Sequence, residues 1–156
     1  MDRSRLSRFV DQPLADLPFE APVSVSATDT VRHAVSLMRE GSQSCVLLME
    51  GARLAGIFTE RDVLTRCTVD GFDWDQPIAN VVTPNPRAIS AEGRVADAIA
   101  TLQQHSYRTL PIVDGERVAG LIRLGDLLTD LAEAFPEDVL NLPPRPHQVM
   151  EKQEGG

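Results

Sequence analysis

Apolar and polar positions follow one another along this chain in two series of segments that have the same order. The first series follows the order strand, helix, strand, strand, helix, and the second follows the same order from its first helix onward. The first series covers residues 23–26, 31–38, 45–49, 53–58 and 60–67, and the second repeats its last four segments over 95–102, 110–113, 117–122 and 124–135. The pattern therefore predicts a β-α-β-β-α unit that is used twice.

The first helix of each unit has one apolar face. Its apolar residues stand three and four positions apart, as they do on one side of an α-helix. They are Val31, Ala34, Val35 and Met38 in the first unit, and Val95, Ala98, Ile99 and Leu102 in the second. In the second unit Asp114-Gly115 separates two apolar runs, which is a strong hairpin signal. Each helix is therefore expected to pack on a core supplied by paired strands.

The two units are copies of one another. Residues 11–65 align without a gap with residues 75–129, at an offset of 64 residues, and 17 of the 55 aligned pairs are identical. A short helix, over 11–17 or 76–82, opens each unit before prolines end it. We therefore divide the chain into a lead-in or first helical turn (1–10), repeat 1 (11–70), repeat 2 (75–135) and a proline-rich tail (136–156).

A small sheet with two helices on one face leaves its other face apolar. The simplest way to bury that face is to pack it on the same face of the other unit. We therefore predict an α+β (mixed α/β) fold in which two β-α-β-β-α repeats pack through their sheets with pseudo-twofold symmetry. The junctions between strand and closing helix then open into clefts along the seam.

Composition and charge narrow the classes of function. The chain of 156 residues is 42% hydrophobic and can bury a core, and it has no apolar run near the roughly 20 residues of a membrane span. Its formal charge of −8 argues against nucleic acid, which proteins bind mainly through Lys and Arg. We expect a cytoplasmic protein without membrane or nucleic-acid partners, in which Cys45 and Cys67 are buried reduced thiols.

A hydroxyl and a carboxylate stand at the start of the helix that closes the first unit. Thr59 ends a strand pattern and Asp62 lies in the first helical turn, where backbone N–H groups lack partners and an anion can bind. The same spacing is also that of a capping box, in which the two side chains bond those N–H groups without any ligand. Spacing alone leaves both interpretations open.

Two segments carry a resemblance to a known family. The order of elements, the run Tyr107–Asp114 (YRTLPIVD) and the segment Gly56–Asp62 (GIFTERD) resemble the CBS-domain family, whose tandem pairs form a Bateman module. The resemblance covers residues 11–135. It implies a regulatory sensor that needs no cofactor, binds an adenine nucleotide (AMP, ADP or ATP) or a related adenosyl ligand, and associates into a homodimer.

The resemblance implies that the first of two composite clefts binds its ligand through both repeats. Asp62 would accept hydrogen bonds from the ribose hydroxyls and Thr59 would bind phosphate, roles that suit a carboxylate and a hydroxyl. Arg108 and Thr109 would approach from repeat 2, although Arg108 could equally be a solvated loop residue. An apolar slot would hold the purine ring between strand residues that include Ile57 and Leu121.

In the second cleft the resemblance implies that Asp126 binds the ribose. The base pocket there would be lined from repeat 1 by Ser24, Ser44 and Cys45. The sequence departs from the family at Arg123, which stands where Thr or Ser is usual. This arginine either tunes the second cleft for more phosphate charge or marks a degenerate site, so the two clefts are not expected to bind alike.

We therefore predict a stand-alone regulatory module that passes ligand occupancy to an unidentified protein through conformation or partner binding. No catalytic residue and no metal site is predicted, because the chain lacks the motifs of nucleophilic, zinc-dependent and phosphate-loop enzymes. The alternative is a ligand-free scaffold for dimerisation or protein interaction, and a third is an enzyme subunit. Apolar residues of the tail (Val139, Leu140, Leu142) either dock on the body or a second subunit or belong to a disordered end.

Overall fold

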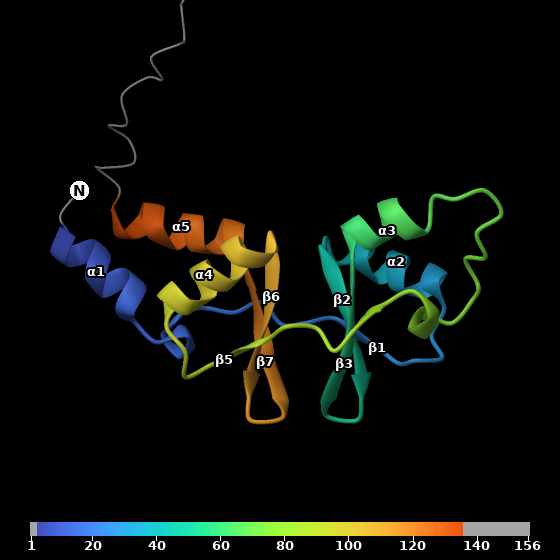
Figure 1. Ribbon diagram of the computed structural model, residues 1–156, viewed down its shortest axis with the longest axis horizontal. Helices are drawn as coiled ribbons and strands as arrows, with labels where there is room; N and C mark the ends of the chain where they lie inside the picture. Colours follow the sequence, from blue (N-terminus) through green and yellow to red (C-terminus); the bar gives the residue numbers. More distant parts are fainter. Residues whose placement is uncertain (1–2, 136–156) are drawn as a thin grey trace, which may run out of the picture.

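The computed structural model describes residues 3–135, and the expectations for the tail lie outside the described residues. The chain forms two lobes, each with a small sheet and helices on the outer side of that sheet (Figure 1). The helices are α1 (Arg3–Asp11), α2 (Val31–Glu40), α3 (Glu60–Arg66), α4 (Val95–His105) and α5 (Leu124–Ala134). The strands are β1 (Ser24–Val25), β2 (Cys45–Glu50), β3 (Arg53–Thr59), β4 (Thr83–Pro84), β5 (Ile89–Ser90), β6 (Thr109–Asp114) and β7 (Arg117–Arg123).

The predicted fold class is confirmed, since two small sheets and five helices make a mixed α/β fold. The sheets have the strand orders β1-β2-β3-β4 and β5-β6-β7. In each, an edge strand runs parallel to the first strand of an antiparallel hairpin. The two hairpins also share an irregular register at the same repeat position, between Leu48 and Met49 in one and between Ile112 and Val113 in the other. Residues that stand 64 positions apart in the sequence therefore occupy equivalent positions in the two hairpins.

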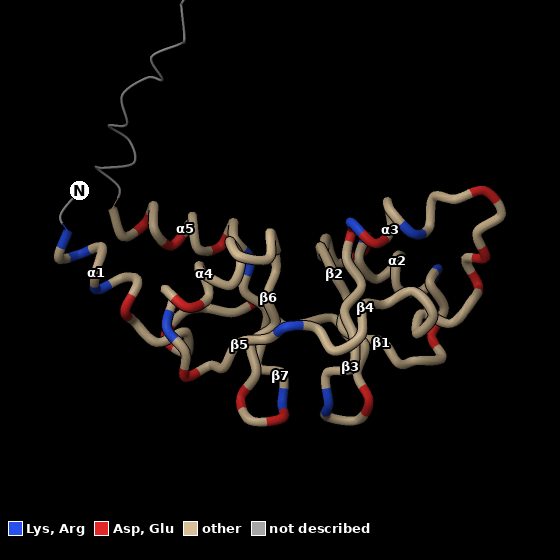
Figure 2. The backbone as a smooth tube through the Cα atoms, in the orientation of Figure 1, with Lys and Arg blue, Asp and Glu red and all other residues tan. Residues whose placement is uncertain are grey.

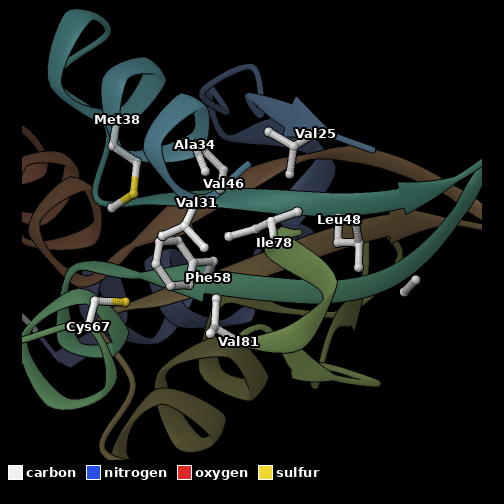
Figure 3. Packing of buried hydrophobic residues seen from close by; sticks show 11 residues of the cluster. Val25, Val31, Ala34, Met38, Val46, Leu48, Phe58, Cys67, Ile78 and Val81 are labelled. Atoms are coloured by element: carbon white, nitrogen blue, oxygen red, sulfur yellow. The ribbon is translucent and has the colours of Figure 1, made fainter. Parts of the chain in front are cut away.

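The segment that opens each repeat packs on the lobe formed by the other repeat. The 3₁₀ turn η1 (Leu14–Asp16) places Leu14 in the core of the second lobe, and Leu14 N–H donates to the carbonyl of Gly93 at 2.8 Å. The turn η2 (Ile78–Asn80) places Ile78 in the core of the first lobe, beside Phe58 (Figure 3). The lobes are therefore interleaved, and each contains chain from both sides of the repeat boundary.

The two sheets meet through apolar residues on their inner faces. Cys45, Leu47 and Leu121 are buried between them, and partly buried residues surround these three: Met49, Leu54, Ile57 and Val118. Burial of this area from water favours the paired arrangement over two separate lobes. The sheet-to-sheet packing is the arrangement that the sequence predicts.

The N-terminal segment forms a complete helix, whereas the sequence predicted a loose lead-in or a single turn. Helix α1 buries Phe9 in the core of the second lobe, with Leu6 and Val10 packed against the same cluster. The Arg5 guanidinium lies 5.5 Å from the centre of the Phe135 ring, a cation–π distance. Apolar residues at helical spacing among the arginines thus give the segment a face that packs on the body.

Candidate functional site: a cleft between the two lobes

A cleft of about 500 Å³ lies between the start of α3 in the first lobe and the loop before β6 in the second. Both repeats contribute to its walls. Six residues predicted from the sequence are brought together there: Ser44, Ile57, Thr59, Asp62, Arg108 and Thr109. The other lining residues are Glu60, Arg61, Leu64, Thr65, Thr83, Pro86, Arg87, Ser106, Tyr107 and Pro111. The cleft thus combines hydroxyl, carboxylate, guanidinium and apolar groups.

Thr59 and Asp62 form the capping box at the start of α3. The Asp62 N–H donates to the Thr59 hydroxyl oxygen at 3.3 Å, and one carboxylate oxygen of Asp62 accepts from the Thr59 N–H at 2.8 Å and from its hydroxyl at 2.9 Å. The other carboxylate oxygen lies 3.4 Å from the Arg66 guanidinium. Both side chains therefore have structural partners, and Asp62 is only 8% exposed. Their roles in ligand binding stay a prediction.

Backbone contacts across each junction occupy the first N–H group of the closing helix. Glu60 N–H donates to the Ser44 carbonyl at 3.0 Å, and Leu124 N–H donates to the Arg108 carbonyl at 2.9 Å. The hydroxyl groups of Ser44 and Thr109 lie 3.1 Å apart and link the lobes at the seam. Because these backbone donors are in use, an anion in the cleft depends on side chains for much of its charge compensation.

Sequence reasoning missed Arg61 and Arg87 as cleft residues. Arg61 lies in the first turn of α3, and Arg87 lies in the linker between β4 and β5, which crosses from the first lobe to the second (Figure 1). The alignment of the repeats gave one indication that Arg87 has a special role, because it stands where the first repeat has the apolar Val23. Its position in the cleft depends on the crossing of the linker, which local sequence does not reveal.

The second predicted cleft is bridged by an ionic network around Arg123. The Arg123 Nε lies 3.2 Å from an Asp126 carboxylate oxygen, and its Nη2 lies 2.8 Å from Glu20 Oε2. Glu20 Oε1 in turn accepts a hydrogen bond from Gln43 Nε2 at 2.6 Å. The hydrogen bond to Asp126, together with both carboxylate charges, raises the pKa of Arg123. Arg123 and Asp126 are therefore brought together, but as partners of one another.

Three other predicted site residues lie apart from the first cleft walls. Cys45 and Leu121 belong to the buried layer between the sheets, where they are 0% and 2% exposed. Burial, together with the Glu20 charge, raises the pKa of the Cys45 thiol to about 11, so it stays protonated at neutral pH. Ser24 is exposed in β1, while Ser44, predicted for the second cleft, lines the first. The positions of Cys45, Leu121 and Ser24 therefore do not support their predicted roles in ligand binding.

Within residues 3–135, no three or more His, Cys, Asp or Glu side chains are grouped so that they could hold a metal ion. Over the same range no helix has both the length and the apolar character that a membrane crossing demands.

Fold and cleft define a class of protein: a tandem pair of α/β repeats with a composite cleft at the seam. A model of the CBS-domain family matches residues 14–68 and 78–133. The chain therefore belongs to the CBS-domain family, with two domains in tandem. Among curated proteins it is similar to the CBS domain-containing protein YhcV of Bacillus subtilis, with 33% identity over 104 residues, which are 67% of this chain and 74% of the relative.

Solved structures show the same fold. A signal-transduction protein with CBS domains from Burkholderia ambifaria is 27% identical, with a TM-score of 0.69 over 77% of this chain and 90% of that one. A CBS domain protein from Pyrobaculum aerophilum, complexed with AMP, is 21% identical, with a TM-score of 0.69 over 78% and 99% of the chains. The CBS domain pair of protein MJ0100, in complex with 5′-methylthioadenosine and S-adenosylmethionine, is 15% identical, with a TM-score of 0.70 over 79% and 98%.

Proposed function

We propose that this chain is a regulatory module that binds an adenosine-containing nucleotide in the cleft lined by Thr59 and Arg108. The module passes on the occupancy of this cleft through conformation or partner binding. The observation that carries the proposal is the cleft itself, whose walls come from both repeats and combine an apolar side with hydroxyl and guanidinium groups. A ligand that contacts both lobes favours one arrangement of the lobes over another, which is the requirement for a sensor.

The solved relatives support an adenosyl ligand. One CBS domain protein of the same fold is complexed with AMP, and another CBS pair is in complex with 5′-methylthioadenosine and S-adenosylmethionine. In the present cleft Ile57 and Pro111 offer apolar contact for a purine, and Arg108 offers a fork of donors for phosphate. Thr59 bonds one carboxylate oxygen of Asp62, while the other lies 3.4 Å from the Arg66 guanidinium and suits a ribose hydroxyl.

Thermal unfolding in the presence of AMP, ADP, ATP, NAD and S-adenosylmethionine tests the proposal. A ligand present at about 100 times its Kd stabilises the folded chain by roughly 2.7 kcal/mol, which raises the Tm by several degrees. Arg108→Ala should reduce the shift, whereas Arg117→Ala, an exposed arginine on the β6–β7 hairpin, should leave it unchanged. Absence of a shift with every ligand contradicts the proposal and favours a scaffold.

An interaction surface on the helices favours the second candidate function, a scaffold or homodimer. Leu64 in α3 and Leu128 in α5 occupy the same repeat position and are 69% and 59% exposed. Both helices lie along the same edge of the molecule (Figure 1). Large exposed apolar side chains repeated about a pseudo-twofold axis suit a symmetric partner, and a second copy of this chain is one.

Light scattering tests the homodimer. The unmodified chain should have the mass of a dimer, and Leu64→Glu combined with Leu128→Glu should convert it to a monomer. Val69→Glu, at an exposed apolar residue outside both helices, is the control and should leave the mass unchanged. A monomeric unmodified chain contradicts this candidate.

Incubation with ATP should produce no ADP, since family membership favours regulation over catalysis.

A further inference from the structure

We infer that the cleft selects for ligands with a chain of several phosphates, through Arg61, Arg87 and Arg108. This inference rests on the proposed nucleotide site and specifies its ligand. All three arginines line the same cleft, and they come from three separate segments: the first turn of α3, the β4–β5 linker and the loop before β6. The positive charge is therefore assembled by the tertiary fold.

The three guanidinium groups have charge to offer a ligand. None of them forms an ion pair or a hydrogen bond with a residue in the part of the chain that the structure describes, and all three side chains are exposed. Several arginines elsewhere are engaged, as Arg32 is with Asp75 at 2.8 Å and Arg53 with Glu50 at 2.6 Å. Three free cations at one cleft contrast with a chain whose formal charge is −8.

The acidic groups of the cleft do not cancel this charge. Its walls hold two carboxylates, those of Glu60 and Asp62, against three arginines. The Asp62 carboxylate already accepts two hydrogen bonds from Thr59 and faces Arg66, which lies outside the lining. Three arginine side chains therefore face one carboxylate, that of Glu60, which has no such partners among the described residues. Figure 2 shows the basic segment of the β4–β5 linker at the seam between the lobes.

The pseudo-symmetric cleft lacks this arrangement. At the positions equivalent to Arg61, Arg87 and Arg108 the other repeat has Gly125, Val23 and Ser44. Arg123, at the start of the helix that closes this repeat, is held by Glu20 at 2.8 Å and by Asp126 at 3.2 Å. Charge for a polyphosphate is therefore concentrated in one cleft of the two.

The chemistry of the candidate ligands gives an order of affinity. Each added phosphate brings anionic oxygens that a guanidinium fork can bind in pairs, so ATP should bind more tightly than ADP, and ADP more tightly than AMP. S-adenosylmethionine carries a sulfonium cation and no phosphate, and should bind most weakly. With exposed charge pairs as the guide, each added phosphate should increase affinity about two- to fivefold.

Isothermal titration calorimetry of the full chain with AMP, ADP and ATP, without divalent metal, measures this order. Arg61→Ala combined with Arg87→Ala should bring the ATP affinity close to that of AMP and leave the AMP affinity nearly unchanged. The same arginines changed to Lys should restore most of the preference, since the charge is kept. Arg117→Ala, at an exposed arginine of the β6–β7 hairpin, should keep the full preference. The preference should also weaken from low to high salt.

The possible outcomes separate the inference from the proposed function. Equal affinity of the unmodified chain for AMP and ATP overturns the inference and leaves the nucleotide site standing. A preference for ATP that survives in the double Ala variant also overturns it. If no nucleotide binds at all, the proposed function fails and the inference fails with it.

Discussion

Glu20 and Arg123 lie 2.8 Å apart (Oε2 to Nη2) and connect the segment before β1 to the end of β7. Glu20 Oε2 is closed off from solvent and makes no well-aligned hydrogen bond, so this contact is ionic. Its other oxygen accepts from Gln43 in the first lobe at 2.6 Å. One carboxylate therefore links a side chain of each repeat across the seam.

Glu20→Gln should destabilise the chain, because the amide keeps the shape of the side chain but removes the charge that faces Arg123. The expected loss is about 1–3 kcal/mol, the range for a half-buried polar group that loses its partner. Chemical denaturation of both proteins at pH 7 measures it. Glu116→Gln, an exposed residue of the β6–β7 turn, controls for the change in net charge. Equal stability of the two variants would show that the ion pair contributes nothing.

Leu121→Ala should weaken the contact between the sheets. Leu121 is 2% exposed in the layer that also contains Cys45 and Leu47, so truncation leaves a cavity there. Large-to-small changes at such sites cost about 2–5 kcal/mol. Val69→Ala, at a residue that is 58% exposed, should change the free energy of unfolding by about 0.5 kcal/mol at most. A loss below about 1 kcal/mol for Leu121→Ala would contradict tight sheet packing.

The fold was predictable from the sequence because the same local patterns occur twice. Apolar spacing placed the helices around Val31 and Val95, and the requirement to bury a second sheet face predicted how the halves pack. Helix α1 was missed although Leu6, Phe9 and Val10 stand at helical spacing, because three apolar residues among polar ones are a short pattern, and the surface that buries Phe9 comes from the second lobe.

The candidate cleft was predictable only in part. Thr59, Asp62 and Arg108 lie in continuous motifs, which is why sequence reasoning reached them. Arg87 reaches the cleft through a linker that crosses between lobes, and Ser44 faces the first cleft through its contact with Thr109. Such positions depend on how distant segments meet, and no local pattern records that.

The two cysteines should be unreactive in the folded chain. Cys45 is 0% exposed and Cys67 is 1% exposed, and burial raises the pKa of both thiols. Because the thiolate is the nucleophile, both access and ionisation oppose reaction at neutral pH. Titration with a chromogenic disulfide reagent at pH 7 should modify neither thiol within minutes and both in denaturant. Rapid reaction of one thiol in the native protein would contradict its burial, and Cys67→Ser would identify which one had reacted.

Asp130 should make the chain slightly less stable at neutral pH than in mild acid. Burial raises the pKa of this carboxyl, and the charges of Glu133 and Asp126 on the same helix raise it further. A carboxyl whose pKa is higher in the folded state opposes folding once it is ionised, and this penalty disappears as pH falls below the unfolded-state pKa of about 3.9. Asp130→Asn should therefore stabilise the chain at pH 7 by about 0.2–0.5 kcal/mol, the size of a like-charge pair on a helix. Thermal unfolding from pH 7 down to pH 3.5 should show the gain shrinking. A gain for Asp130→Asn that is constant with pH would mean that the substitution acts through helix propensity and not through charge.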